Sequence, residues 1–282
     1  MNENNRELSL EQLPQTSIVE KVQPRQIPSF EFEFPIGIIN KNKEICKKFK
    51  IRPMTGRIRK QVGDTKYHNN QLKITEMLIK ETLLEVEGVD IISDSMISNM
   101  LPGDRDFLLL KLKKISMPKD EENIILSAKC SACKCDMEME INIDSFKINK
   151  MDDKFNSDIM NIKGINHRIF SIESEEYGKL IMRFQTLSDQ EIVSPLFRKN
   201  PIEAEHLLLS RLIISYNGKP LTPDDFDDLS LPEITWIEDN SISHNFGVDL
   251  TKEIECYNCN AKNEMSVDIL GFLFQSRRSK IK

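Results

Sequence analysis

The chain has 282 residues, of which 39% are hydrophobic and 30% charged, and its formal net charge is -6. This composition suits one large folded domain or two small ones, and it weighs against a broad nucleic-acid-binding surface, which needs clustered positive charge. No apolar run approaches the roughly 20 residues of a membrane-spanning helix and no secretory signal opens the chain, so we expect a cytoplasmic protein that binds neither nucleic acid nor membrane.

The amino-terminal residues, 1–28, are polar and show no regular period, so they predict a flexible arm. Phe30, Phe32 and Phe34 then alternate with glutamates, as in a half-buried strand, and Pro35 and Gly37 predict the end of that strand. Residues 1–35 are therefore expected to form a flexible N-terminal arm and an edge strand. The strand either completes a sheet of this chain, which we favour, or adds to the sheet of a partner.

From residue 49 onward, similar residues recur in the same order at separations of 126 to 131 positions. Matches that include Arg, Gly, Leu-Pro and CxxC in one order are hard to obtain by chance, so the pattern predicts an internal duplication. The matched positions are Arg52 with Arg183, Thr55 with Thr186, Leu72 with Ile202, Leu78 with Leu208, Ile79 with Leu209, Leu83 with Ile213, Gly88 with Gly218, Leu101-Pro102 with Leu231-Pro232, and Cys130, Cys133 and Phe146 with Cys256, Cys259 and Phe272.

Each copy is expected to contain a strand, a helix, a second helix and a β-hairpin that carries a CxxC pair. Repeat 1 spans residues 36–146, and repeat 2 spans residues 179–282, including a basic tail. The polar segment between them, 147–178, is expected to be a linker. The predicted fold class is α+β.

Four of the six cysteines form the pairs Cys130-Ser131-Ala132-Cys133 and Cys256-Tyr257-Asn258-Cys259, each between segments of alternating apolar residues. This pattern places each pair at the tip of a hairpin, where two intervening residues let both thiols point at one metal ion. Each such turn is called a knuckle here. A structural Zn²⁺ takes four ligands, so the two knuckles predict one zinc per chain, bound by Cys130, Cys133, Cys256 and Cys259 in a zinc-ribbon-like site.

Two other interpretations of the pairs stay open, namely a thiol redox centre and knuckles without metal. The redox interpretation is less favoured because a reactive CxxC usually begins a helix, whose dipole lowers the thiol pKa. Cys135, whose counterpart is Ala261, is expected to be a bystander rather than a fifth ligand, although metal exchange could use it. Cys46 is expected to be a partly buried thiol.

No residue pattern indicates a catalytic centre or a cofactor-binding motif, so we expect a protein that is not an enzyme. Asp104 and Asp106 could pass for a carboxylate pair, but they fall at a predicted helix start, where acidic residues cap backbone donors. Capping is the interpretation that we prefer. The four histidines stand in unrelated sequence contexts: His68, His167, His206 and His244.

Two segments carry a family resemblance: Arg52-Pro53-Met54-Thr55-Gly56-Arg57, and Leu101-Pro102-Gly103-Asp104-Arg105-Asp106-Phe107-Leu108-Leu109-Leu110 followed by the first knuckle. Together they resemble the baseplate hub and hub-assembly proteins of contractile phage tails of the T-even type and of phage-like extracellular injection systems. The resemblance covers about residues 49–275 and is only an outline in the second half.

This resemblance implies a non-enzymatic structural or assembly component of a baseplate hub, with hub and spike proteins as partners. Its members either remain in the finished particle or act as assembly factors, so retention in the particle stays open. The alternative is a zinc-ribbon nucleic-acid-binding or transcription accessory protein, which the mixed charges beside the knuckles do not favour.

Overall fold

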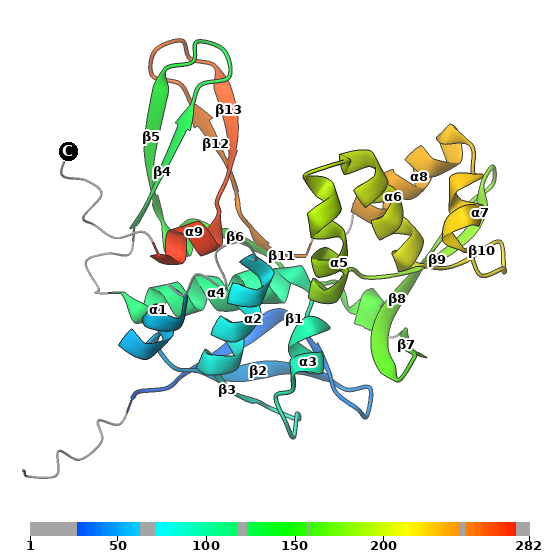
Figure 1. Ribbon diagram of the computed structural model, residues 1–282, viewed down its shortest axis with the longest axis horizontal. Helices are drawn as coiled ribbons and strands as arrows, with labels where there is room; N and C mark the ends of the chain where they lie inside the picture. Colours follow the sequence, from blue (N-terminus) through cyan, green and yellow to red (C-terminus); the bar gives the residue numbers. More distant parts are fainter. Residues whose placement is uncertain (1–26, 63–70, 118–122, 157, 243–245, 275–282) are drawn as a thin grey trace, which may run out of the picture.

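The computed structural model describes residues 27–62, 71–117, 123–156, 158–242 and 246–274. Within these ranges the fold is α+β. Figure 1 shows two lobes side by side, with a pair of β-hairpins that rises from the first lobe. None of the helices in the described ranges combines the length and the apolar character that crossing a bilayer requires.

The first lobe is a three-stranded antiparallel sheet, in the order β1-β2-β3, with helices packed over one face. The other face is charged: Glu31 lies opposite Lys50, and Lys50 forms an ion pair with Glu85 at 2.8 Å. Its elements are β1 (Phe30–Ile39), β2 (Ile45–Ile51), β3 (Leu83–Val86), α1 (Gly56–Val62), α2 (Gln71–Thr82), α3 (Asp94–Ser98) and α4 (Pro102–Ser116).

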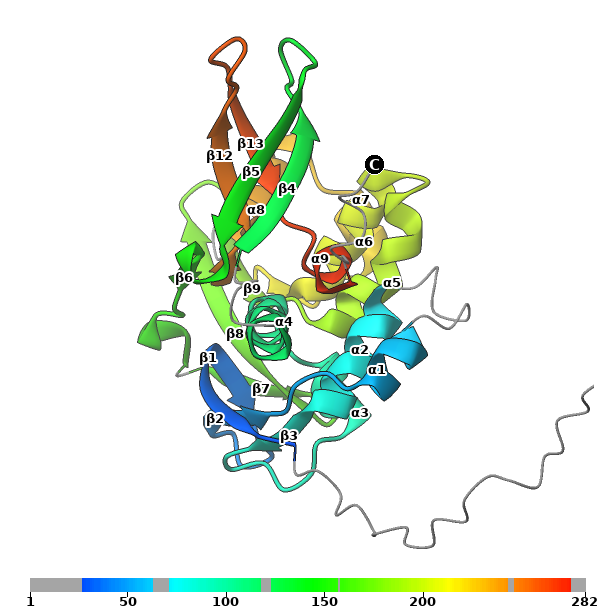
Figure 2. The ribbon, with the colours of Figure 1, turned by 90° about the vertical axis from the view of Figure 1, so that its left-hand side faces the viewer.

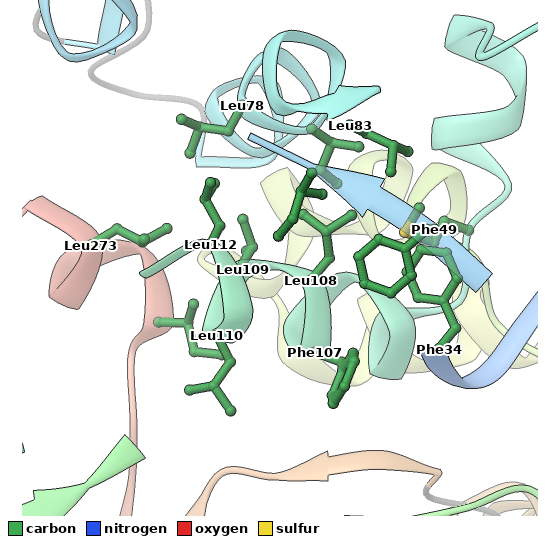
Figure 3. Close-up of a cluster of buried hydrophobic side chains, with 14 of the residues drawn as sticks. Phe34, Phe49, Leu78, Leu83, Phe107, Leu108, Leu109, Leu110, Leu112 and Leu273 are labelled. Carbon is green, nitrogen blue, oxygen red and sulfur yellow. The ribbon is translucent and has the colours of Figure 1, made fainter. Parts of the chain in front are cut away.

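The core of this lobe forms around α4 (Figure 3). Leu108 and Leu112 of α4 are fully buried; Leu112 points toward Leu78 of α2, and Leu108 lies beside the aromatic side chains of the sheet. Phe34 and Phe49 stack there with ring centroids 3.9 Å apart. Burying each such side chain contributes roughly 1.5–3 kcal/mol, so this cluster fixes the helices on the sheet.

The sequence predicted that this strand would end at Pro35 and Gly37. Strand β1 instead continues to Ile39. A register shift against β2 between Glu33 and Ile38 accommodates both residues. Proline is tolerated because β1 is an edge strand, and Gly37 supplies a positive φ of 97° that favours glycine. The strand completes a sheet of this chain, which is the alternative that the sequence favoured, and residue 35 lies within the strand. The predicted arm falls mostly in residues 1–26, outside the described ranges.

The second lobe has a four-stranded antiparallel sheet in the order β10-β9-β8-β7 and four helices. Its core contains Phe170, Leu180, Met182, Leu209 and Ile237. Its elements are β7 (Ile159–Ile162), β8 (Ile165–Ser174), β9 (Gly178–Arg183), β10 (Ile213–Tyr216), α5 (Leu187–Phe197), α6 (Pro201–Leu212), α7 (Pro223–Asp227) and α8 (Leu231–Ile242).

The segment 147–178, which we expected to be a linker, is part of the folded body. It contains β6 (Lys147–Asn149), the 3₁₀ turn η5 (Asp153–Asn156), β7 and all of β8. Met151 and Phe170 from this segment are buried in the core of the second lobe. These apolar residues recur among the polar ones, and pairing with β9 and β11 satisfies the backbone of β8 and β6.

Both hairpins stand on α4, on the side away from the first sheet (Figure 2). The first hairpin is β4 (Asn123–Lys129) and β5 (Asp136–Asn142), followed by the 3₁₀ turn η4 (Ile143–Ser145). The second is β12 (Thr251–Glu255) and β13 (Lys262–Ser266), preceded by β11 (Gly247–Asp249) and followed by α9 (Ile269–Phe274). Ile141 of β5, Phe146 after η4, Val267 after β13 and Leu273 of α9 enter the core of the first lobe, so the chain returns to that lobe after the second hairpin.

Asp104 does not cap its own helix, so the capping interpretation is wrong for this residue. The N-cap of α4 is Leu101, whose side chain makes no capping bond. The fully buried Asp104 carboxylate instead accepts the backbone N–H groups of Ile36 and Gly37 at 2.9 and 2.8 Å. Desolvation raises the pKa of Asp104 to about 6, although these two bonds oppose the shift. Tertiary contact with β1, rather than the helix terminus, decides its role.

Candidate metal centre

Each CxxC pair lies at the tip of a hairpin, as predicted. In the first hairpin the Cys130 N–H donates to the Cys135 carbonyl at 2.9 Å, and the Lys134 N–H donates to the Cys130 carbonyl at 3.0 Å. Lys134 adopts a positive φ of 63°. This tight turn folds the second cysteine of the pair back beside the first.

The second hairpin repeats these bonds at matching positions. The Cys256 N–H donates to the Ala261 carbonyl at 2.9 Å, and the Asn260 N–H donates to the Cys256 carbonyl at 2.8 Å. Asn260 has a φ of 57°. The two knuckles therefore share one backbone conformation.

The structure brings together all four cysteines predicted as ligands. The sulfur atoms of Cys130, Cys133, Cys256 and Cys259 lie within 4.8 Å of one another. The Sγ atoms of Cys130 and Cys259 are 3.6 Å apart, and those of Cys133 and Cys256 are 3.7 Å apart. A tetrahedral ion with metal–sulfur bonds of about 2.3 Å places its sulfurs about 3.8 Å apart, so the cluster fits a four-thiolate metal ion.

Both of these separations join one hairpin to the other. The hairpins rise side by side from α4 (Figures 1 and 2), and no strand pairing links them among the described residues. Cys130 and Cys256 are fully buried between the tips, whereas Cys133 and Cys259 face outward. An ion at this point would hold both tips together, with half of its ligands shielded from solvent.

Asn263 and Asn258 support the cluster and were not predicted. Asn263, on β13, is buried, and its Nδ2 donates to the Ala261 carbonyl at 2.8 Å and lies 3.6 Å from Cys130 Sγ. The Nδ2 of Asn258 donates to Cys133 Sγ at 3.5 Å. One sequence signal was available: Asn263 occupies the inward position that Met137 fills in the first hairpin, and a buried amide in an apolar alternation needs partners.

Hydrogen bonds to the sulfurs favour the thiolate state at two positions. The backbone N–H of Cys133 lowers the pKa of Cys130. The Asn258 amide and the Cys135 N–H lower the pKa of Cys133 to about 5. Because thiolates are the form that binds metal, these donors prepare the first knuckle for a cation.

Cys135 lies closer to the cluster than the bystander interpretation implied. Its Sγ is 3.3 Å from the Sγ of Cys133 and 3.3 Å from that of Cys256. Hydrogen bonding with these two thiols raises the pKa of Cys135 to about 12. Cys46, by contrast, is buried in the core of the first lobe, where desolvation raises its pKa, in agreement with the expected buried thiol.

The histidines of the described ranges lie in structural settings. His206 on α6 packs edge-on against Phe226 and is 3.5 Å from Asp227. Burial in β8 lowers the pKa of His167. The other two, His68 and His244, lie outside the described residues.

Comparisons of this chain with protein families, with curated proteins and with solved structures found no match. Its function is therefore inferred from the cysteine cluster, the fold and the sequence pattern.

Proposed function

We propose that Cys130, Cys133, Cys256 and Cys259 bind one structural Zn²⁺, and that this chain is a non-catalytic structural or assembly component of the baseplate hub of a contractile tail or injection machine. The observation that carries the zinc site is the convergence of four sulfurs, two from each hairpin, at zinc–thiolate separations. Four thiolates leave zinc without an open position for water or substrate, so such a site supports structure rather than catalysis.

An internal duplication is part of this proposal. The order of two strands, two helices, one strand, two helices and a hairpin recurs from β1 to β5 and from β8 to β13, with β11 as an extra strand in the second half. The sheet orders β1-β2-β3 and β8-β9-β10 also correspond. Two copies that present their knuckles to each other would explain how cysteine pairs so distant in sequence supply one ion.

Matched side chains support the same relationship. Arg52 directly follows β2 and forms an ion pair with Glu81 on α2 at 3.7 Å. Its counterpart Arg183 ends β9 and binds Asp189 in a bidentate ion pair at 2.6 and 2.7 Å. Asp189 also accepts from Arg211, which occupies the position of Glu81 on α6. Each arginine thus joins its strand to the following helices through a carboxylate.

The assignment to a baseplate hub is based on the resemblance of residues 52–57 and 101–110, and the contacts of the second segment favour an architectural role. Gly103 packs so closely on β11 that a Cβ would lie 2.1 Å from the Phe246 carbonyl oxygen. Asp104 holds β1, and the Arg105 Nη1 donates to the Gln190 side chain of α5 at 2.6 Å. These residues join the sheet, the hairpin base and the second lobe.

The hairpins give little support to the nucleic-acid alternative. They carry six carboxylates and four lysines, so their combined charge is negative. The carboxylates of β5, β12 and β13 are exposed: Asp136, Glu138, Glu140, Glu253, Glu255 and Glu264. A phosphate backbone would meet repulsion along both hairpins.

Affinity capture of the tagged full-length chain, co-expressed with the proteins of its own gene cluster, tests the assignment. We expect hub or spike components in the captured material after nuclease treatment. Capture of nucleic acid alone, lost with that treatment, would favour the transcription-accessory alternative and contradict the baseplate role.

A further inference from the structure

Three thiols form a compact triangle on one side of the four-cysteine cluster. The Sγ of Cys135 is 3.3 Å from that of Cys133 and 3.3 Å from that of Cys256, and the Cys133 and Cys256 sulfurs are 3.7 Å apart. Two corners of the triangle are therefore ligands of the proposed zinc site. The third corner belongs to Cys135, which directly precedes the return strand β5 of the first hairpin.

The knuckle backbone does not require a cysteine at position 135. The role of this residue in the turn is to accept the Cys130 N–H with its carbonyl group. Ala261 performs the same role for Cys256 in the second hairpin at the same distance of 2.9 Å. The Cys135 thiol is thus an addition to a conformation that a methyl side chain already satisfies.

A triangle of thiolates suits a soft metal ion. Cu(I) prefers thiolate ligands, whereas structural zinc takes four ligands and hard ions take oxygen. A trigonal ion with metal–sulfur bonds of about 2.3 Å would place its sulfurs about 4.0 Å apart, so the two 3.3 Å sides of the triangle would each open by about 0.7 Å. Cys135 is half-buried, which leaves a small ion a path from solvent.

We propose that Cys133, Cys135 and Cys256 form a second, three-thiolate site for a soft monovalent ion of the Cu(I) type, which shares two sulfurs with the four-cysteine site. The shared sulfurs, which are already thiolates when zinc is bound, would bridge the two ions, and the proton of the Cys135 thiol would pass to solvent when Cu(I) binds. The inference extends the proposed zinc site, but it depends only on the three sulfurs of the triangle.

Native mass spectrometry of the full-length protein, purified with zinc and given one equivalent of Cu(I) without oxygen, tests this site. We expect the wild type to form a species with one zinc and one Cu(I). Cys135→Ala, which copies Ala261, should keep zinc but lose the mixed species, so that Cu(I) stays free or displaces zinc. Cys46→Ala, which removes a thiol remote from the cluster, should behave as the wild type does.

Cys259→Ser separates this site from the four-cysteine site, because it removes a ligand of the latter alone. It should lose zinc and still take up one Cu(I). A mixed species in Cys135→Ala equal to that of the wild type would overturn the proposal, as would a wild type that binds Cu(I) only by releasing zinc. If neither the wild type nor Cys135→Ala contains zinc and Cu(I) uptake depends on Cys135, the zinc site is refuted and the three-thiolate site is upheld.

Discussion

Ser131 at the tip of the first hairpin donates both its backbone N–H and its hydroxyl group to the Oδ1 atom of Asn263 in the second hairpin, each at 2.8 Å. Asn263 is only 7% exposed, so the acceptor is shielded from water, whereas Ser131 lies on the exposed tip. Both bonds join the two tips independently of any metal. The zinc ligands are consequently positioned by the protein as well as by the ion they would bind.

Replacement of Asn263 by Met, the residue at the matching position 137, should weaken this joint. The Ser131 N–H and hydroxyl group would lose their shared acceptor, and the net loss of a hydrogen bond of this kind costs about 0.5–1.5 kcal/mol. Urea denaturation should show this loss of stability, and a colorimetric chelator should remove zinc faster. Asn258→Ala, at an exposed position, is the matched control with a smaller effect on unfolding. Equal stability of Asn263→Met and wild type would show that the inter-hairpin bonds contribute nothing.

Metal analysis should give one zinc per chain, and loss of Cys256 should abolish binding as fully as loss of Cys130. The reason is that both sulfurs lie in the one four-cysteine cluster and would be ligands of the same proposed ion, so neither knuckle would hold it alone. Atomic absorption on Cys130→Ala and Cys256→Ala measures this, with Cys46→Ala as the control that retains zinc. Half an equivalent or more in either knuckle variant would contradict a shared site.

Removal of zinc should loosen the hairpins while both lobes stay folded. Metal-binding energy is coupled to folding at the tips, whereas the lobes have their own apolar cores. Hydrogen exchange should accelerate in residues 123–142 and 251–266 after chelation, and α4 should stay protected. Uniform acceleration across the chain would instead mean that zinc supports the whole fold.

Asp104 should make stability depend on pH in an unusual direction. Its folded pKa, about 6, lies above the unfolded value, so the native state holds the proton more tightly. This contribution is fully present below about pH 4, the unfolded pKa, and is lost as pH rises through about 6. Relative to Asp104→Asn, the wild type should lose on the order of 1 kcal/mol per pH unit across that window. Denaturant midpoints at several pH values measure the difference, and parallel curves for the two proteins would contradict it.

Gly103→Ala should destabilise the protein by more than about 2 kcal/mol, because the added methyl group would overpack its contact with backbone atoms. Backbone atoms, unlike the end of a side chain, cannot rotate out of the way. The added Cβ would meet the Phe246 carbonyl oxygen at 2.1 Å. Gly56→Ala is the matched control, since no atom lies within 4 Å of its added Cβ. Guanidinium unfolding should separate the two variants, and similar midpoints would show that α4 and β11 can move apart freely.

The cysteine cluster could be predicted from the sequence because spacing and alternation are local signals. CxxC between alternating apolar segments identified both hairpins, and the repeated order of residues indicated that Cys130 and Cys256 meet. The short strands β3 and β10 escaped notice because each follows a helix directly, without an intervening turn signal. Asp104 was misinterpreted because its partners, Ile36 and Gly37, are distant in sequence. Cys135 was judged by comparison with Ala261, which carries no information about sulfur contacts across the hairpins.

The return of the chain to α4 near its end has a consequence for biosynthesis. Val267, Ile269 and Leu273 belong to the same core as Phe34 and Phe49, so the first lobe cannot complete its interior while the ribosome is still making the second. Contacts between residues so far apart in sequence make folding slow, because closing the long loop costs conformational entropy before the contacts stabilise the chain. Until α9 emerges, α4 exposes apolar side chains that a chaperone or an early assembly partner could cover.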